Sequence, residues 1–374
     1  MASGSQHQSG KNAILLPEIE AMLNRVNVLN NYENAEEFNS RKLMSSEFIK
    51  LGFRTKTLGP LLIVSAEGEK CILREGDTSF TAVTAYHMLK DKRLSRAIFR
   101  RAGVSFAEGR TFKISNKEAA REKVSEFGNA VLKPFDGRKG SGVSVNVTPA
   151  TFEAAWDAAL RRTGRRILVE KYFAQGDEAR YLVVDSQCIA VAMRVPPTVL
   201  GNGKGTVRQL IDAKNELRAN NPHLGKRPIF VDDYRRLILA SQGFDLDSIP
   251  AKGQTVVIDW KSNASTGGET RGITDLVHPS MKRIAERVAR AIPGLHVGGV
   301  DILSRDHTSK ADPQNYIVIE ANTLPDLGLH LFPMYGRPVN VCRLIAESCA
   351  RRMGFEAGRL GNADARPNGT TAVA

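Results

Sequence analysis

The chain has 374 residues, enough for two or three domains of roughly 150 residues each and for a large buried core. Hydrophobic residues make up 42% and charged residues 25%, which excludes a disordered or fibrous chain, and no stretch approaches the ~20 apolar residues of a membrane-spanning helix. The net charge of +13 indicates an anionic partner, an anionic substrate or a basic solvated surface. A nucleic-acid partner is disfavoured, because the densest basic cluster, at 161–166, contains no aromatic residue.

The two ends of the chain are polar, and the N-terminal segment lacks the apolar core of a secretory signal. We therefore expect a cytoplasmic protein, with residues 1–13 and 357–374 disordered. The four cysteines form no CxxC pair, so we expect them to pack in the core rather than to bind zinc or form a disulfide framework.

The first predicted units follow in chain order. Residues 14–90 alternate short apolar runs with helical stretches, which predicts a small N-terminal α/β domain. A helix is expected from Asp91 to Ala102, where Gly103 ends it. Two β-type runs then flank a glycine-rich segment and predict a hairpin, and further strands follow. Together we expect residues 91–200 to form a central α+β domain.

Residues 201–356 are expected to form a C-terminal domain built on a sheet. Its first part, 206–242, is predicted to be a basic helical insertion. Apolar residues recur at helical spacing between Met281 and Ile292, which indicates a helix packed on a core. The runs VGGVDIL and NYIVIEAN are predicted to be strands of the sheet. The fold class predicted for the chain is α+β.

Three polar residues at strand ends form a candidate metal site. Glu320 and Asn322 are two apart, so the alternation of a strand points both side chains to one face, and Asp301 ends a neighbouring apolar strand. Oxygen ligands without nearby histidine or cysteine are typical of a hard cation such as Mg²⁺ shared with substrate phosphates. The alternative is that these residues are ordinary strand-end polar groups.

A second candidate site is Lys133 with the loop DGRKGSG that follows it. Glycines allow backbone N–H groups to approach phosphate oxygens closely, and Lys133 would add a positive charge from within a strand. The spacing is not that of a P-loop, and the loop joins two strands instead of opening a helix. The alternative is a flexible hairpin turn.

A third candidate lies in LVEKYF and GDEAR, residues 168–180. A charged residue inside an apolar strand is expensive unless partnered, so Glu170 could accept a hydrogen bond from an adenine amino group and Glu178 could hold ribose hydroxyls. The alternative is an edge strand with an ordinary exposed Glu–Lys pair.

Taken together and in this order, the stretches VLKPFDGRKGSGVSVNV, VEKYFAQGDEAR, NASTGGETRGITDLVHP and IEANTLPDLGLHLFPMYGRPVNV resemble the ATP-grasp superfamily. The resemblance is closer to the ATP-grasp module of cyanophycin synthetase and of fused glutathione-synthesising (glutamate–cysteine ligase/glutathione synthetase) enzymes, and it covers about residues 76–350. It implies an ATP-grasp fold in which residues 14–90 form a small N-terminal α/β domain, residues 91–200 form the central lid and residues 201–356 form the C-terminal sheet domain.

The resemblance also implies which residues bind and react. ATP would lie between the lid and the C-terminal sheet, with Mg²⁺, expected as two ions and with Mn²⁺ as a substitute, on Asp301, Glu320 and Asn322. Arg194, Asn263 and Lys133 would be catalytic, the first two facing the reacting phosphate and the substrate carboxylate. The implied nucleotide-binding residues are Lys92, Lys133, Gly140, Ser141, Gly142, Glu170, Phe173 and Glu178.

Two positions depart from the family pattern. Ala179 stands where members often have a histidine before the arginine of GDxxR, and Gly328 stands where the cyanophycin enzymes carry the arginine of PGLRMH. We therefore expect an acceptor pocket that differs from theirs. The second, Mur-ligase-like half of cyanophycin synthetase is also missing from these 374 residues, so polymerisation of two amino acids by this chain is not expected.

The expected activity is that of an ATP-dependent carboxylate–amine ligase acting on small amino-acid or peptide substrates through an acyl phosphate, with release of ADP and phosphate. A γ-glutamyl dipeptide is the favoured product, and a homo-oligomer is left open. The alternatives are a ligase that modifies the end of a larger peptide, a catalytically silent nucleotide-binding or scaffold protein, and a nucleic-acid-binding protein.

Overall fold

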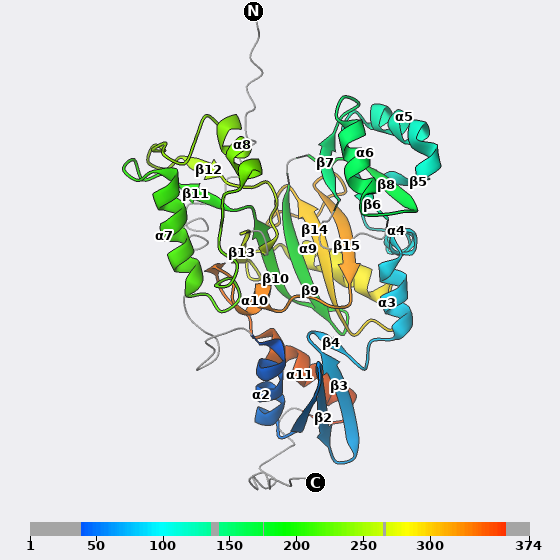
Figure 1. The fold of residues 1–374 in the computed structure, drawn as a ribbon. Helices are drawn as coiled ribbons and strands as arrows, with labels where there is room; N and C mark the ends of the chain where they lie inside the picture. Colours follow the sequence, from blue (N-terminus) through cyan, green and yellow to red (C-terminus); the bar gives the residue numbers. More distant parts are fainter. Residues whose placement is uncertain (1–38, 136–141, 175, 265–266, 357–374) are drawn as a thin grey trace, which may run out of the picture.

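The computed structural model describes residues 39–135, 142–174, 176–264 and 267–356. These residues form four sheets with helices between them, which confirms the predicted α+β class (Figure 1). Gly140 and Ser141 of the predicted phosphate-binding loop lie outside the described residues, as do the two ends that were expected to be disordered.

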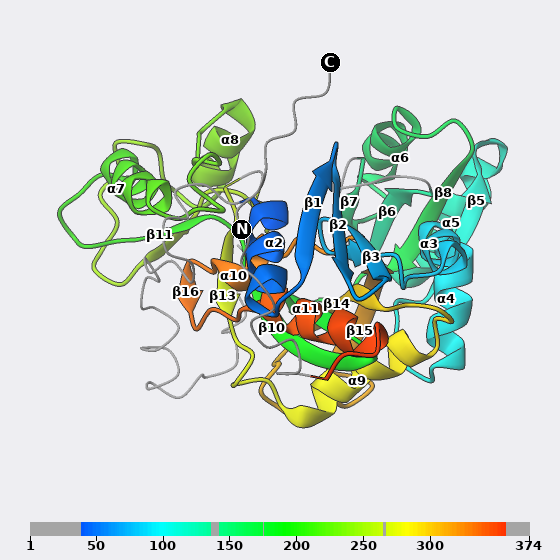
Figure 2. The same ribbon diagram turned by 90° about the horizontal axis from the view of Figure 1, so that it is seen from below.

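The N-terminal unit consists of one helix and a four-stranded antiparallel sheet of order β1-β2-β3-β4. Its elements are α2 (Ser40–Lys50), β1 (Arg54–Leu58), β2 (Leu61–Ala66), β3 (Glu69–Arg74) and β4 (Asp77–Thr78). Buried side chains of this unit share one core with helix α11 (Val341–Arg352) and with part of the largest sheet. Figure 2 shows α2 lying beside α11 on this side of the molecule. The unit is therefore stabilised by the C-terminal end of the described chain.

Two helices, α3 (Val83–Lys90) and α4 (Lys92–Arg101), connect this unit to the lid. The side chain of Asp91 caps α4 by accepting a hydrogen bond from the backbone N–H of Arg93 at 2.8 Å. The helix ends at Ala102, and Gly103 follows with φ of 60°, a backbone conformation that favours glycine. Both ends agree with the sequence prediction.

The lid is a four-stranded sheet of order β5-β8-β6-β7 with two helices on one face (Figure 1). Its elements are β5 (Gly109–Lys113), the 3-10 turn η1 (Ile114–Asn116), α5 (Lys117–Phe127), β6 (Ala130–Pro134), β7 (Ser144–Val147), α6 (Phe152–Leu160) and β8 (Arg166–Lys171). Phe152 and Trp156 of α6 fill a core that belongs to this unit alone. Strands β6 and β7 pair in antiparallel register and confirm the predicted hairpin.

The largest sheet has six strands in the order β15-β14-β9-β10-β13-β16. These are β9 (Asp177–Val184), β10 (Gln187–Val195), β13 (Glu269–Gly272), β14 (Val297–Ser304), β15 (Tyr316–Asn322) and β16 (Tyr335–Gly336), with helices α9 (Pro279–Arg290) and α10 (Gly328–Leu331) packed against them. The turn between β9 and β10 falls at Asp185 and Ser186, both with positive φ, as the sequence indicates.

The sheet pairing differs from the expected grouping of residues 91–200 as one lid, because β9 and β10 hydrogen-bond with β14 and β13 instead of with the lid strands. Six of the eight residues of β9 are buried, so this strand needs cover on both faces. The six-stranded sheet gives that cover, because one face of β9 packs in the core with α9 and the other packs in the core with α11. The remaining domain boundaries stay predictions.

Alternation along β9 explains how one strand serves both the core and a polar site. Tyr181 and Val183 pack with α9 on one face of the sheet. On the other face, Leu182 packs toward α11, whereas Arg180, two residues earlier on the same face, lines a cavity. The same face thus changes from apolar to charged along its length.

The predicted insertion is helical and packs as a small unit with a two-stranded sheet. It comprises β11 (Thr198–Leu200), α7 (Val207–Ala219), α8 (Asp233–Ser241) and β12 (Thr255–Val257). Thr206 and Gln209 form a capping box at the start of α7. Lys214 of α7 pairs with the buried Glu269 of β13 at 2.5 Å and ties the insertion to the six-stranded sheet.

Two compositional expectations hold for the described part of the chain. Cys71, Cys342 and Cys349 are buried and Cys188 is partly buried, all as free thiols, which confirms core packing. Within the described ranges, every helix is too short or too polar to span a bilayer.

A buried histidine joins the N-terminal unit to the rest of the fold. Nδ1 of His296 lies 2.7 Å from Oγ1 of Thr78 in β4, and Nε2 lies 2.8 Å from Oγ of Ser348 in α11. Ser348 also donates to the carboxylate of Asp185, which Arg352 holds at 2.6 Å. Burial lowers the pKa of His296 to about 4, although the Asp185 charge partly opposes this shift.

The free energy of unfolding should therefore fall as the pH drops from about 6.5 to about 4. In that range the unfolded chain binds a proton on this side chain and the folded chain does not, so His296 alone should cost on the order of 3 kcal/mol by the bottom of the range. Denaturant unfolding of the wild type and His296→Gln at pH 7, 6 and 5 tests this.

We expect His296→Gln to be less stable at pH 7 but to lose less stability on acidification. The exposed His87→Gln is the control and should keep the wild-type pH dependence. An unchanged pH dependence in His296→Gln would contradict the assignment.

Candidate functional site

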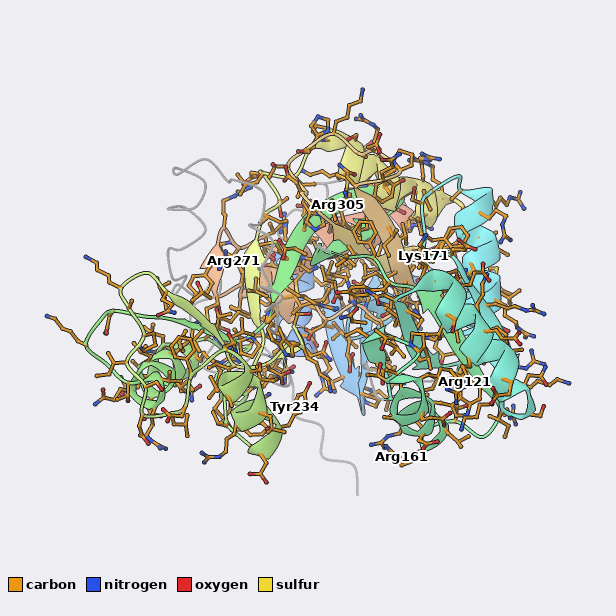
Figure 3. All side chains as sticks on the ribbon, turned by 90° about the horizontal axis from the view of Figure 1, so that it is seen from above. Arg121, Arg161, Lys171, Tyr234, Arg271 and Arg305 are labelled. Atoms are coloured by element: carbon orange, nitrogen blue, oxygen red, sulfur yellow. The ribbon has the colours of Figure 1, made fainter. Side chains whose placement is uncertain are left out.

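A cavity of about 1630 Å³ lies between the lid, the six-stranded sheet and the insertion. Figure 3 views this region from above, with Tyr234 on the insertion and Arg121 and Arg161 on the lid lying on opposite sides of the sheet. Pockets for single small ligands usually have about 300–1000 Å³. The cavity therefore has room for more than one ligand.

The lid side of the cavity contains a buried carboxylate between two cations. Glu170 of β8 is 7% exposed, and its two oxygens lie 2.5 Å from Nζ of Lys133 and 2.6 Å from Nη1 of Arg96. Strand β8 lies between β5 and β6, so the alternative of an exposed edge-strand pair is wrong. The buried charge is compensated locally, and a ligand in the cavity would meet Lys133 already held by Glu170.

The sequence analysis did not assign Arg96 a role. The sequence feature that could have indicated a role for Arg96 is its spacing of four residues from Lys92, which places the two side chains near each other on helix α4. Lys92 also lines the cavity, and its positive charge acts on Glu320.

Of the predicted nucleotide-binding residues, Phe173 lines the cavity, whereas Gly142 is not among its lining residues. The ring of Phe173 lines the wall, and the guanidinium of Arg305 stacks 5.6 Å from its centre. Gly142 has φ of 71°, and a Cβ there would lie 2.9 Å from side-chain carbons of both Pro134 and Arg162. Another residue would be strained at this position, directly after the loop that the structure leaves undescribed.

The predicted metal ligands come together on the face of the sheet that borders the cavity. Asp301 of β14 lies directly opposite Glu320 of β15, and Gly299 lies opposite Asn322. The ladder shifts register just after the Asp301 pair, so β15 contains a bulge. Without that bulge Glu320 would share the core-facing side of Val318, which is two residues away. The expected shared face of Glu320 and Asn322 thus depends on local backbone geometry as well as on alternation.

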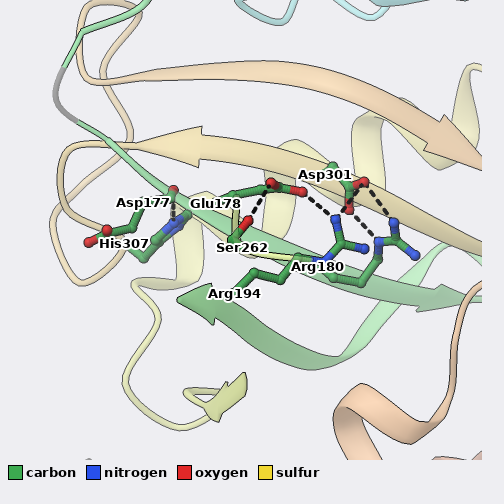
Figure 4. Close-up of polar contacts among 7 residues, drawn as sticks. All are labelled: Asp177, Glu178, Arg180, Arg194, Ser262, Asp301 and His307. Atoms are coloured by element: carbon green, nitrogen blue, oxygen red, sulfur yellow. Dashed lines mark hydrogen bonds and ion pairs between the residues drawn. The ribbon is translucent and has the colours of Figure 1, made fainter. Parts of the chain in front are cut away.

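Two arginines from neighbouring strands surround Asp301 (Figure 4). Arg180 of β9 makes two hydrogen bonds to the buried carboxylate, one of 2.7 Å from Nη2, and Nη1 of Arg194 in β10 lies 3.6 Å away. Burial opposes the ionisation of Asp301, but these charges outweigh burial and its pKa is lowered. The pKa of Glu320 is raised, first by desolvation and then by the Asp301 charge.

These three side chains fit a hard cation by their chemistry, with two carboxylates and one amide oxygen on one wall. Oδ1 of Asn322 is buried and has no hydrogen-bond partner among the described residues. No cluster of three histidine, cysteine, aspartate or glutamate side chains that could hold a metal occurs among the described residues. A cation here would therefore depend on Asn322 or on ligand oxygens to complete its coordination.

The remaining predicted residues form the far side of the site. Arg194 pairs with Glu178, and Oε2 of Glu178 lies 3.3 Å from Oγ of Ser262 (Figure 4). Asn263 follows Ser262 and also lines the cavity. Glu178, expected to hold a ribose, is thus already engaged by Arg194 in the ligand-free chain.

A second buried histidine fixes the edge of this wall. Nε2 of His307 lies 2.9 Å from the carbonyl oxygen of Asp177, which can only accept, so Nε2 carries the proton (Figure 4). Nδ1 then accepts from the hydroxyl of Tyr181 at 2.8 Å. Burial lowers the pKa of His307 to about 4, so the ring stays neutral near pH 7 and holds the start of β9 beside Glu178.

Several cavity residues carried little or no sequence signal. Arg180 ends the GDEAR stretch, but its partner Asp301 is 121 positions away. Ser262 adjoins the predicted Asn263, and only its contact with Glu178 gives it a role. The other cavity residues to which the sequence analysis assigned no role include Arg227, Trp260, Asp326 and Leu329.

Replacing Arg180 with methionine should destabilise the fold by about 3–5 kcal/mol, because Asp301 would keep a buried charge with only the more distant Arg194 beside it. A matched control is Arg337→Met, which removes an exposed pair with Asp275 of the same two-bond geometry, at 2.6 and 2.8 Å. That change should cost at most about 1 kcal/mol. Equal losses in denaturant unfolding would show that burial of Asp301 does not matter.

Comparisons with known proteins agree with this architecture, although no family model matches the sequence. The cyanophycin synthetase of Nostoc sp. strain PCC 7120 is 32% identical over 278 residues, which are 72% of this chain and 30% of that protein. The glutathione biosynthesis bifunctional protein of Mannheimia succiniciproducens is 32% identical over 268 residues, 70% of this chain and 35% of that protein. The chain thus spans about a third of the length of these relatives.

The crystal structure of a bifunctional glutathione synthetase from Pasteurella multocida superimposes with a TM-score of 0.65 and 27% identity. The match covers 84% of this chain and 44% of that structure. The sequence relatives and this structural neighbour confirm the resemblance on which the sequence analysis relied. The chain is therefore homologous to ATP-grasp ligases, namely the cyanophycin synthetases and the bifunctional glutathione biosynthesis proteins.

Proposed function

We propose that the protein is an ATP-dependent carboxylate–amine ligase that joins amino acids through a peptide or γ-glutamyl bond, by way of an acyl phosphate. The observation that carries this proposal is that one cavity wall combines the oxygen ligands Asp301, Glu320 and Asn322 with cations from the lid and from β10. Anionic oxygens suit a divalent cation, and the flanking lysine and arginine suit phosphate groups.

The nucleotide would bind between the lid and the six-stranded sheet. Phe173 offers an apolar surface for a base, and Lys133 and Lys92 offer positive charge to the phosphates. Binding would compete with the ion pairs that Lys133 and Arg194 make with Glu170 and Glu178. These pairs keep the cations in place before the ligand arrives and limit the cost of ordering them.

When bound, Mg²⁺ would be held by Glu320, Asn322 and Asp301 and would supply charge neutralisation at the terminal phosphates. The chain's own side chains would do the rest. Arg194 and Lys133 would stabilise the negative charge that develops in phosphoryl transfer, and Asn263 would orient the substrate carboxylate. The lid would exclude water from the reactive intermediate.

The reaction balances without a protein nucleophile. A carboxylate oxygen attacks the γ-phosphorus, the bond to the ADP oxygen breaks, and an acyl phosphate forms. The amine then attacks the acyl carbon, phosphate leaves with the C–O electron pair, and the amine nitrogen loses a proton. None of the four cysteines lines the described cavity wall, which agrees with direct attack by the substrate.

The relatives' names support amino-acid or peptide chemistry, because one is a cyanophycin synthetase and others are glutathione biosynthesis proteins. Two metal ions, replacement of Mg²⁺ by Mn²⁺, and a homo-oligomer stay predictions. A ligase acting on a peptide end and a catalytically silent nucleotide-binding protein are the alternatives. Measuring ATP turnover with candidate substrates separates the silent protein from both ligases.

Glu320→Gln should reduce turnover by two or more orders of magnitude while the fold stays intact, because a carboxylate that faces Asp301 loses its charge at the phosphates. ADP release and the far-ultraviolet circular dichroism spectrum measure the two effects. Glu118→Gln on helix α5, whose side chain is 78% exposed, is the control and should retain wild-type turnover. Near-normal activity of Glu320→Gln would exclude the metal assignment.

The products of ATP should be ADP and phosphate, without AMP or pyrophosphate. Lys92, Lys133 and Arg194 line the same cavity as the proposed metal ligands, and this combination favours attack at the terminal phosphorus. With hydroxylamine as the amine, the activated donor should be trapped as a hydroxamate. Nucleotide analysis by chromatography gives the answer, and AMP in amounts equal to product would reject the acyl phosphate.

A further inference from the structure

One part of the cavity is not explained by nucleotide or metal binding. Arg227, from the segment between α7 and α8, and Asp326, which follows β15, both line the wall. Their side chains are 36% and 40% exposed, and Nη1 of Arg227 lies 3.9 Å from Oδ2 of Asp326. That separation exceeds a hydrogen bond, so each group retains capacity to bind a ligand of opposite charge.

A buried histidine contacts both groups and orients the carboxylate. Nε2 of His223 lies 3.0 Å from Oδ2 of Asp326 and 2.9 Å from Nη1 of Arg227. An ionised carboxylate can only accept, so Nε2 donates to Asp326 and cannot also accept from Arg227, which is a close neighbour of the ring. The other carboxylate oxygen of Asp326 accepts a hydrogen bond from the backbone N–H of Gly328 at 3.0 Å. The carboxylate is therefore oriented from two sides, while part of it faces the cavity.

Because Gly328 has no side chain, the ring of His223 can pack directly against its backbone. A Cβ at Gly328 would lie 2.2 Å from Cδ2 of His223, so no larger residue fits while the ring is present. The arginine that PGLRMH carries at this position is incompatible with His223. At this part of the wall the insertion contributes Arg227, and the segment after β15 contributes Asp326.

Asp326 is ionised whenever the protein is folded near neutral pH. Burial raises the pKa of this carboxyl, but the His223 hydrogen bond and the charges of His223 and Arg227 outweigh burial and lower it. Such a weak base does not remove a proton from an ammonium group near neutral pH. Its role is charge recognition.

We propose that Arg227 and Asp326 bind the α-carboxylate and the α-ammonium of a free amino acid, and that this amino acid reacts through its side-chain carboxylate. An amino acid held in this way has both α groups engaged, so neither is available for phosphorylation or attack. The donor is thus a dicarboxylic amino acid, and the amide forms at its side chain. This inference rests on the proposed ligase function and specifies its donor.

The test uses hydroxylamine as the amine, so the natural acceptor need not be known. The probes are L-glutamate, L-aspartate, N-acetyl-L-glutamate and glutarate, each with MgATP and the full chain. We expect L-glutamate or L-aspartate to give a hydroxamate at the side-chain carboxyl, located by fragmentation in mass spectrometry. N-acetyl-L-glutamate and glutarate should have KM values at least tenfold higher.

Asp326→Asn and Arg227→Gln should each raise the KM of the donor at least tenfold with little change in kcat or in the KM of ATP. Asparagine can still accept the hydrogen bond from Gly328, so the local backbone is preserved. The matched controls are Asp247→Asn and Arg208→Gln, the same changes in an exposed pair of the insertion, which should leave both KM values unchanged. If Asp326→Asn fails to bind MgADP, Asp326→Glu, which keeps the charge, replaces it and should also raise the donor KM.

Calorimetric titration of the amino acid into the MgADP-bound protein separates this inference from the ligase proposal. Amino-acid binding that Asp326→Asn weakens, without any ATP turnover, supports the site and rejects the ligase. ATP-dependent hydroxamate at an α-carboxyl, or equal use of glutarate and L-glutamate, supports the ligase and overturns the site. Unchanged donor KM in both cavity variants also overturns it.

Discussion

The site depends on the buried carboxylate of Asp301 at the centre of the six-stranded sheet. Three adjacent strands supply this group and its two compensating arginines, Arg180 and Arg194. A buried charge without such partners would cost several kcal/mol of folding free energy. The strand order that brings both arginines to Asp301 therefore stabilises the polar cavity wall. Residues of the next strand, Glu320 and Asn322, can therefore offer oxygens to a cation without an uncompensated charge behind them.

The cavity is built from parts that are stabilised separately. The lid has its own apolar core, and the insertion has another. The Lys133–Glu170 ion pair on the lid holds a cation next to the cavity. The Lys214–Glu269 ion pair anchors the insertion to the six-stranded sheet. Because each unit has its own core, the cavity between them does not depend on one shared apolar core. Such an arrangement suits the ligase that we propose, which would admit two substrates and then exclude water.

The insertion meets the cavity at a small group of residues that depend on one another. His223 fills the space above Gly328 and contacts Asp326, so a change at one of these positions requires changes at the others. The nucleotide side depends on strands and helix ends that the ATP-grasp resemblance covers. In our proposal, the residues that recognise the reacting amino acid are therefore different from those that bind ATP.

The sequence by itself determined the local elements and the residue types of the site. Periodicity and caps predicted α4, the β6–β7 hairpin and the β9–β10 turn, because these features depend on neighbours in the chain. Tertiary structure alone decided that β9 joins β14, that Arg180 meets Asp301, and that Glu170 sits between Lys133 and Arg96. Those contacts join residues far apart in sequence, and their energies come from burial and charge compensation that no local pattern records.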